Sequence, residues 1–405
     1  AEHMETINRE TLQADFDAFD ISEEFGFLLE EPLVSFIVTF SFLITIDIFC
    51  LYSLCRMSLM PVLIPNLLND HRELSLAHLA LGFISMGYVW QEGQHAPAQV
   101  LPKALAVPYW LISRRLGLPP ILTYADSVLS NWKLRDPTGN MEIGNMDLIF
   151  SFPGGESCRG FFIVSLLVEL AASSGIGALE VMHAMKSSDV AGIQNGLVKV
   201  TQSLKKMKET FKLMHSKFKL NLSPIFVSGW RDNPMLPNGL LYEGVSTEPM
   251  FLSGGSAAQS SAIQCFDALL CIQHEDETGA FLTRMRDYMP PAHCQLIETL
   301  SARPSLRDLI LSCSSSDLCQ AYNSCVSAMV DLRSYHLYAV QKYIIGPGNH
   351  TMGCPLRGVG TMLNDKGTGG SNLMGFLKGV CNTTKKALIS ERPSVPRENV
   401  MSFNI

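Results

Sequence analysis

A histidine and an arginine three residues apart are the side chains of this sequence that most suggest metal chemistry. The stretch from Leu332 to Leu337 reads LRSYHL, and positions three apart share a face of a helix, so Arg333 and His336 lie together. An imidazole nitrogen ligates iron, and an arginine pairs with a carboxylate. This pairing suits a haem, which has iron at its centre and propionates at its edge. The competing interpretation is a histidine that is hydrogen bonded within the core.

A second run predicts the wall of a pocket. Phe161, Ser165 and Glu169 recur every four residues in an otherwise apolar stretch and therefore share a helix face. A small hydroxyl beside an aromatic ring lines pockets for flat ligands. The alternative, which the sequence by itself favours, is that Ser165 donates a hydrogen bond to the backbone carbonyl of residue 161.

Two stretches with glycines are candidate ligand contacts. Residues 254–261 read GGSAAQSS, which lets a backbone approach a ligand closely, or which supplies serines to cap a helix. Asp267 follows in an apolar helix and needs a partner, for which Arg333 is the candidate. Residues 366–370 read KGTGG and either close over a site with Thr368 against a substrate or form a plain linker.

The composition indicates a large core and excludes a nucleic-acid surface. The 405 residues are 47% hydrophobic and 17% charged, and the net charge is −7 without a strongly basic block. The 11 cysteines form no CxxC pair, and no secretory signal opens the sequence. We therefore expect reduced, mostly buried thiols in a cytoplasmic protein.

Hydrophobic periodicity predicts a mainly α protein with two domains. The small N-terminal domain is expected at residues 1–145 and the large helical domain at 146–405, with a mobile loop at 346–370. Residues 101–118 contain two prolines and only short apolar pieces. Helices are expected at residues 71–90, 160–172, 198–217, 260–273, 281–289, 318–345 and 373–390.

One segment departs from this pattern. Residues 33–55 are apolar or hydroxylic except for Asp47, and the segment is long enough to span a bilayer. A transmembrane helix, a buried core segment and an aberrantly translated stretch are all compatible with it.

Eight motifs, in order, give the sequence a resemblance to the indoleamine 2,3-dioxygenases. Three runs, WQEG, FPGGES and GVSTEP, look more like the second vertebrate paralogue than the first. The resemblance covers most of residues 72–387. The motifs are YADSVLSNW (124–132), FPGGESCRGFFIVSLLVE (152–169), SGW (228–230), YEGVSTEP (242–249), SGGSAAQSS (253–261), MRDYMPPAH (285–293), LRSYH (332–336) and KGTGG (366–370).

The resemblance implies a small N-terminal α or mixed domain and a large all-helical domain that holds haem b. His336 matches the proximal iron ligand, and Arg333 matches the propionate-side arginine, with Asp267 nearby. Thr368 matches the threonine of the closing loop. The remaining matches, around the distal pocket and along the backbone beside the substrate, are Tyr124, Ser127, Val128, Phe161, Ser165, Gly255, Ser256 and Ala257.

The family uses dioxygen to open the indole of L-tryptophan or related indoleamines, giving N-formylkynurenine, and a reductant is needed for ferric haem. No side-chain general base is demanded, so Ser165 would orient water or substrate. A haem protein that binds oxygen without turnover, as certain molluscan myoglobins of the same fold do, is the alternative. A signalling scaffold is a third, but no clear phosphotyrosine motif supports it.

Two departures from the family pattern stand out. Pro224 occupies the position of an arginine that holds the substrate carboxylate, and Lys219 replaces a pocket phenylalanine, so weak tryptophan binding is expected. Residues 33–55 replace amphipathic helices, which favours an error in the gene model over a membrane anchor.

Overall fold

The computed structural model describes residues 13–33, 70–93, 96–173, 177–216, 228–313, 315–345 and 373–390, and this part of the chain is mainly helical. Short strands pair parallel as β1 with β4, and antiparallel as β2 with β3. The elements in chain order are α4 (His71–Trp90), β1 (Val100–Leu101), α5 (Lys103–Leu116), η3 (Ala125–Ser130), β2 (Lys133–Leu134), β3 (Met146–Asp147), α6 (Glu156–Ala171), α7 (Gly177–Lys186), α8 (Val190–Phe211), α9 (Leu213–Ser216), β4 (Leu241–Tyr242), η6 (Ala257–Gln259), α10 (Ser261–Leu269), α11 (Asp276–Met285), η7 (Arg286–Tyr288), α12 (Pro291–Ala302), α13 (Leu306–Cys313), α14 (Ser316–Val340), η8 (Gln341–Ile345) and α17 (Leu373–Lys386).

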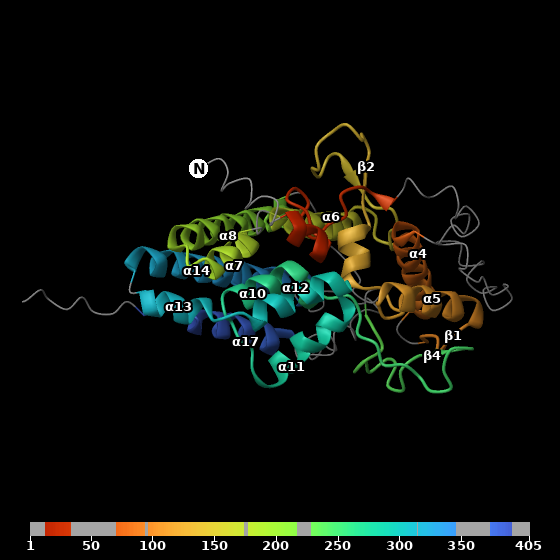
Figure 1. The fold of residues 1–405 in the computed structure, drawn as a ribbon. Coiled ribbons are helices and arrows are strands. Elements are labelled where there is room, and N and C mark those ends of the chain that lie inside the picture. The colour runs from red at the N-terminus through yellow and green to blue at the C-terminus, as the bar shows by residue number, and fades with distance from the viewer. Residues whose placement is uncertain are drawn as a thin grey trace, which may run out of the picture.

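A group of long helices forms one end of the molecule, and α4 with α5 forms the other (Figure 1). Helix α8 packs against α6, α7 and α14, and α14 also packs against α17. Helix α6 lies between the two ends, because its side chains belong to the large apolar cluster around α4 and α5 and its last residue belongs to the cluster around α8 and α14. A ligand site beside α6 can therefore draw residues from both parts.

Helix α8 shows why the long helices pack as they do. Ile193, Leu197, Val200 and Leu204 recur at helical spacing and are fully buried, while lysines occupy much of the outer face. Each such side chain contributes roughly 1.5–3 kcal/mol on burial. Asp189 caps the N-terminus by accepting a hydrogen bond from the backbone amide of Gly192.

The α4 helix is buried on nearly all sides, including the polar side chain of His78. The Nδ1 atom of His78 lies 2.8 Å from Asp126 Oδ1, which joins α4 to η3. His293 is also buried and lies near the hydroxyl of Ser261. Both histidines therefore have structural roles in the core.

Several sequence-based helix boundaries need correction. Helix α4 has the predicted bounds, but α10 ends at Leu269, and Cys271 adopts a positive φ of 56° just beyond it. Helix α5 forms across Pro108, where only short apolar pieces were expected. Helices α7, α12 and α13 were not predicted at all.

The unusual segment at residues 33–55 lies almost wholly outside the described residues; only Leu33 is described, and it is buried. Within the described part of the chain, no helix is long and apolar enough to cross a membrane.

Candidate functional site

Helix α14 carries the predicted iron ligand near its C-terminal end. The His336 side chain retains some exposed surface although protein atoms surround it closely, and its ring centroid lies 5.7 Å from that of Phe211. No described residue forms a hydrogen bond with it. Burial, assisted by the charge of Arg333, lowers the pKa of His336 to about 4. The imidazole is therefore neutral at neutral pH and has a lone pair available for a metal.

One turn earlier, Arg333 forms the ion pair that the sequence predicted with Asp267. Its Nη2 atom lies 2.6 Å from Asp267 Oδ2, and its Nη1 atom donates to the hydroxyl of Thr384 on α17. His274 Nε2 lies 3.1 Å from the same Asp267 oxygen. Burial by itself would raise the pKa of Asp267, but Arg333 and His274 outweigh burial and hold this pKa below its usual range. The pair is therefore charged at neutral pH.

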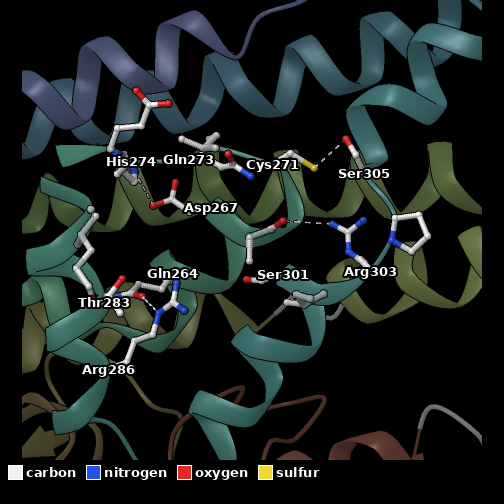
Figure 2. A pocket seen from close by; sticks show the side chains of 17 residues that line it. Gln264, Asp267, Cys271, Gln273, His274, Thr283, Arg286, Ser301, Arg303 and Ser305 are labelled. Atoms are coloured by element: carbon white, nitrogen blue, oxygen red, sulfur yellow. Dashed lines mark hydrogen bonds and ion pairs between the residues drawn. The ribbon is translucent and has the colours of Figure 1, made fainter.

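A cavity of about 390 Å³ lies beside Asp267, between α10, α11 and α12. Figure 2 shows Asp267 and His274 together on one wall, with Arg303 and Ser305 further along it. Asp267 is the one predicted site residue among those lining it. Among the described residues, the cavity therefore shares Asp267 with the site predicted around His336.

Helix α6 supplies the predicted pocket wall. The Ser165 hydroxyl donates a 2.8 Å hydrogen bond to the backbone carbonyl of Phe161, so the structure confirms the interpretation that the sequence favoured. Phe161 is half-buried and packs in the small apolar cluster of Val164 and Met214. Phe211 packs in the same cluster and also contacts His336, so it joins the α6 wall to the α14 side.

Glu169 lies one turn beyond Ser165 on this wall and accepts two side-chain hydrogen bonds. Its Oε1 atom accepts hydrogen bonds from the Tyr124 hydroxyl at 2.9 Å and from the Ser260 hydroxyl at 2.6 Å. Its Oε2 atom is buried and has no hydrogen-bond partner among the described residues. Burial raises the pKa of Glu169, and the two hydroxyls oppose that rise only in part.

The segment at η3 lies beside the predicted substrate strip. Gln259 accepts a hydrogen bond from the Tyr124 amide through Oε1 and donates to the Gly254 carbonyl through Nε2, at 2.9 and 2.8 Å. Gly254 also lies against Gly229, where a Cβ atom would come within 2.2 Å of the Gly254 nitrogen. Glycine at position 229 therefore permits the close approach of these two backbones.

The other residues predicted for the substrate side lie in or next to η3 and η6. Ser127 Oγ donates to the Thr123 carbonyl at 2.9 Å, and Val128 is buried in the core. Ser256 caps η6 by accepting from the Ala258 amide, with Ala257 as the first residue of that turn. Gly255 lies close to the backbone of Thr123, because a Cβ atom added at this glycine would be 3.7 Å from the Thr123 carbonyl carbon. Tyr124 and residues 254–260 are thus brought together in the structure.

Three predicted features lie outside the described residues: Thr368, Pro224 and Lys219. The sequence placed Glu169 on the pocket wall but gave no indication of its partners. It missed three other contributors. Phe211, His274 and Thr384 had no sequence signal, since their contacts depend on how separate helices pack.

The described residues fit a haem. A single protein ligand suffices for iron that four porphyrin nitrogens already hold, and His336 offers one neutral imidazole without another partner among these residues. The Tyr335 hydroxyl and one oxygen of Asp267 are also buried without a partner among the described residues. On the α6 side, the neighbouring wall is apolar and aromatic, as a flat macrocycle requires.

Comparison with known proteins places these residues in context. The chain matches the family model "Indoleamine 2,3-dioxygenase" over residues 15–387. It is 44% identical to indoleamine 2,3-dioxygenase 2 of Homo sapiens over 397 aligned residues, covering 93% of this chain and 96% of that protein. It is 46% identical to indoleamine 2,3-dioxygenase 1 of Rattus norvegicus over 340 residues, covering 82% and 84%. A myoglobin of Haliotis madaka is 37% identical over 338 residues, covering 81% and 85%.

Proposed function

Because the chain belongs to the indoleamine 2,3-dioxygenase family, we propose that it is a haem-dependent dioxygenase that converts L-tryptophan and dioxygen to N-formylkynurenine. The family match extends over almost the whole length of the chain and of its relatives, so the likeness is not confined to a single motif. When bound, haem b supplies the iron that activates dioxygen. The protein would supply the His336 imidazole as the iron ligand and the shape of the site.

The roles of the residues follow from their contacts. His336 offers a neutral imidazole nitrogen to iron, and the charged Asp267–Arg333 pair fixes the helix that carries it. Phe161 presents an aromatic ring to an indole. The Ser165 hydroxyl is engaged with a helix carbonyl, so this residue shapes the site and does not take a proton. Tyr124, Ser127, Val128 and the strip at Gly255, Ser256 and Ala257 form the rest of the substrate wall.

The observation that carries this proposal is the state of His336. The His336 imidazole is partly exposed, forms no hydrogen bond with the described residues, and has its pKa lowered to about 4, so a neutral ring nitrogen is free for coordination. This imidazole also stands at the position that matches the family's iron ligand.

The proposal extends to features that lie beyond the described contacts. Thr368 closes over bound substrate, the division between a small and a large domain falls near residue 146, and the enzyme acts in the cytoplasm with an external reductant that keeps the iron ferrous. Pro224 removes the arginine that holds the substrate carboxylate in the family, which makes tryptophan binding weak.

The decisive experiment measures product formation by purified, haem-loaded protein. Incubation with L-tryptophan, dioxygen and a reductant should yield kynurenine after hydrolysis of the formyl product, with a high KM. The matched control is a Tyr338→Phe protein, altered on the exposed face of α14 and expected to be as active as the parent. Stable oxygen binding without any product would contradict the enzymatic proposal.

That contrary result would favour a second function, oxygen binding without turnover. Two observations support this candidate: the similarity to an abalone myoglobin and the proline at position 224. An oxygen carrier needs His336 and a dry site but no carboxylate clamp for an amino acid. Restoring the clamp with Pro224→Arg should lower the KM for tryptophan if the protein is an enzyme.

A further inference from the structure

We propose that Glu169 is the positioning residue of the substrate wall: by holding Tyr124 and Ser260 on one oxygen, it fixes α6, η3 and the segment at residues 254–260 as a single unit. This inference rests on the proposed function, which makes that wall the tryptophan side of the site. In this proposal Glu169 touches neither the substrate nor the haem and acts through Tyr124 and Ser260, the two residues that it holds.

The first support is the convergence of three separate parts of the chain. Tyr124 lies 45 positions and Ser260 lies 91 positions from Glu169 in the sequence, yet both hydroxyls donate to the same carboxyl oxygen. The bonds are 2.9 and 2.6 Å long, and Glu169 is 2% exposed. Removing this one acceptor therefore leaves the buried Ser260 hydroxyl and the partly buried Tyr124 hydroxyl without this partner.

The second support is that both partners are themselves held at a second point. The Tyr124 amide donates to Gln259 Oε1, next to Ser260 in the chain, so Tyr124 is fixed at its backbone and at its hydroxyl. Ser260 Oγ also accepts from the Ile263 amide and thereby caps α10. Glu169 closes a ring of hydrogen bonds that runs from η3 through residues 259 and 260 and back through α6.

The third support is the absence of a counter-charge among the described residues that bond to Glu169. Its hydrogen-bond partners are hydroxyls, and burial raises its pKa. The neutral hydroxyl donors need an acceptor oxygen at this position but no negative charge. Glutamine offers the same acceptor oxygen without a charge and could therefore hold the same two hydroxyls. Position and hydrogen-bond acceptance, rather than charge, are therefore the contribution of Glu169.

The test compares Glu169→Gln with Glu169→Leu in the haem-loaded enzyme. Glu169→Leu is expected to raise the KM for L-tryptophan by about tenfold, as loss of a buried hydrogen-bond acceptor would, and to change kcat much less, since binding is disturbed before chemistry. Glu169→Gln should restore the KM to within about threefold of the parent. A KM for Glu169→Leu equal to the parent, or a Glu169→Gln protein as impaired as Glu169→Leu, would overturn the proposal.

Tyr322→Phe is a matched control. The Tyr322 hydroxyl donates a buried 2.7 Å bond to the Leu270 carbonyl, away from the α6 wall. Tyr124→Phe and Tyr322→Phe each delete one hydrogen-bonded phenol hydroxyl, but only Tyr124→Phe should raise the KM. Equal effects of the two substitutions on KM would indicate a general loss of stability and would contradict the proposal.

A second readout needs no catalysis and so separates this inference from the proposed function. Urea unfolding is measured in a pair of double-mutant cycles. The cycles use the parent and the single variants Tyr124→Phe, Glu169→Gln and Glu169→Leu. They also use the two double variants that combine Tyr124→Phe with each change at position 169. In the Glu169→Leu background, Tyr124→Phe should cost almost nothing, whereas in the Glu169→Gln background it should keep its cost. Additive effects in the leucine cycle would overturn the inference even if the enzyme is active, and coupling would support it even if no product forms.

Discussion

Glu169 and Asp267 are both buried carboxyl groups on helices, but their surroundings move their pKa values in opposite directions. Glu169, on the α6 wall, has hydroxyl partners, and burial raises its pKa. For Asp267, on the α14 side, burial acts in the same sense, yet Arg333 and His274 hold its pKa below the usual range. Partners rather than depth of burial thus decide the charge of each side of the site.

The difference has a functional meaning. The α6 side is joined by hydrogen bonds from neutral hydroxyl donors, and under the proposed function it is the wall that faces the indole. The α14 side contains an ion pair one turn from His336, and under the proposed function this pair orients the helix that carries the metal ligand.

The largest expected effect comes from breaking the ion pair at one end. Arg333→Ala leaves the Asp267 carboxylate buried with His274 as its remaining side-chain partner, and this type of change costs about 3–5 kcal/mol. The free energy of unfolding from urea titration should fall by that amount. Arg135→Ala, which removes an exposed pair with Asp147, is the control and should cost less than about 1 kcal/mol. Equal losses in the two variants would show that the buried pair has no special weight.

A second prediction uses the opposite pKa directions. Asp267 has a lowered pKa in the folded state, so its contribution to stability is present above its unfolded pKa of about 3.9 and disappears as the pH falls. Glu169 has a raised pKa, so its contribution is present below its unfolded pKa of about 4.3 and disappears as the pH rises through the folded value.

Urea unfolding between about pH 2 and pH 8 tests both directions, because the loss at Asp267 falls below its unfolded pKa of about 3.9 and the loss at Glu169 falls above its unfolded pKa of about 4.3. Asp267→Asn should reduce the fall in the free energy of unfolding as the pH decreases. Glu169→Gln should reduce the fall in the free energy of unfolding as the pH increases. If both substitutions changed the same side of the profile, the contrast between the two carboxyl groups would be wrong.

The smallest effect is expected at Ser165. Its hydroxyl is already bonded to the Phe161 carbonyl, so Ser165→Ala should lower kcat by less than about tenfold. A residue that transferred a proton would contribute about 10²–10⁴-fold. Steady-state kinetics with tryptophan distinguishes the two, and a loss in the larger range would assign Ser165 a role in proton transfer.

The sequence predicted the parts of the fold that depend on local periodicity. Helices α4, α6 and α14 follow from apolar spacing, and the overall mainly helical class is confirmed. Helix α5 was missed because Pro108 lies inside it and a proline in a helix interior normally breaks it; here surrounding core contacts of Leu105, Tyr109 and Ile112 override that preference.

In the candidate site, too, local sequence patterns predicted some contacts and could not predict others. Arg333 and His336 are three residues apart, so their shared face could be inferred, and Asp267 was named because a buried carboxylate needs a cation. The bonds from Tyr124 and Ser260 to Glu169 join distant parts of the chain. Such contacts follow from the packing of α6 against η3 and α10, which no local pattern encodes.

Coordination of haem iron by His336 is tested most directly by the absorbance spectrum and haem content of His336→Ala beside the parent. The parent should bind haem and show the Soret band of a histidine-ligated ferric haem, and the variant should purify without haem. His183→Ala, which alters a histidine paired with Asp15, is the control and should retain the cofactor. A normal haem content and an unchanged Soret band in His336→Ala would contradict the assignment of this imidazole as the iron ligand.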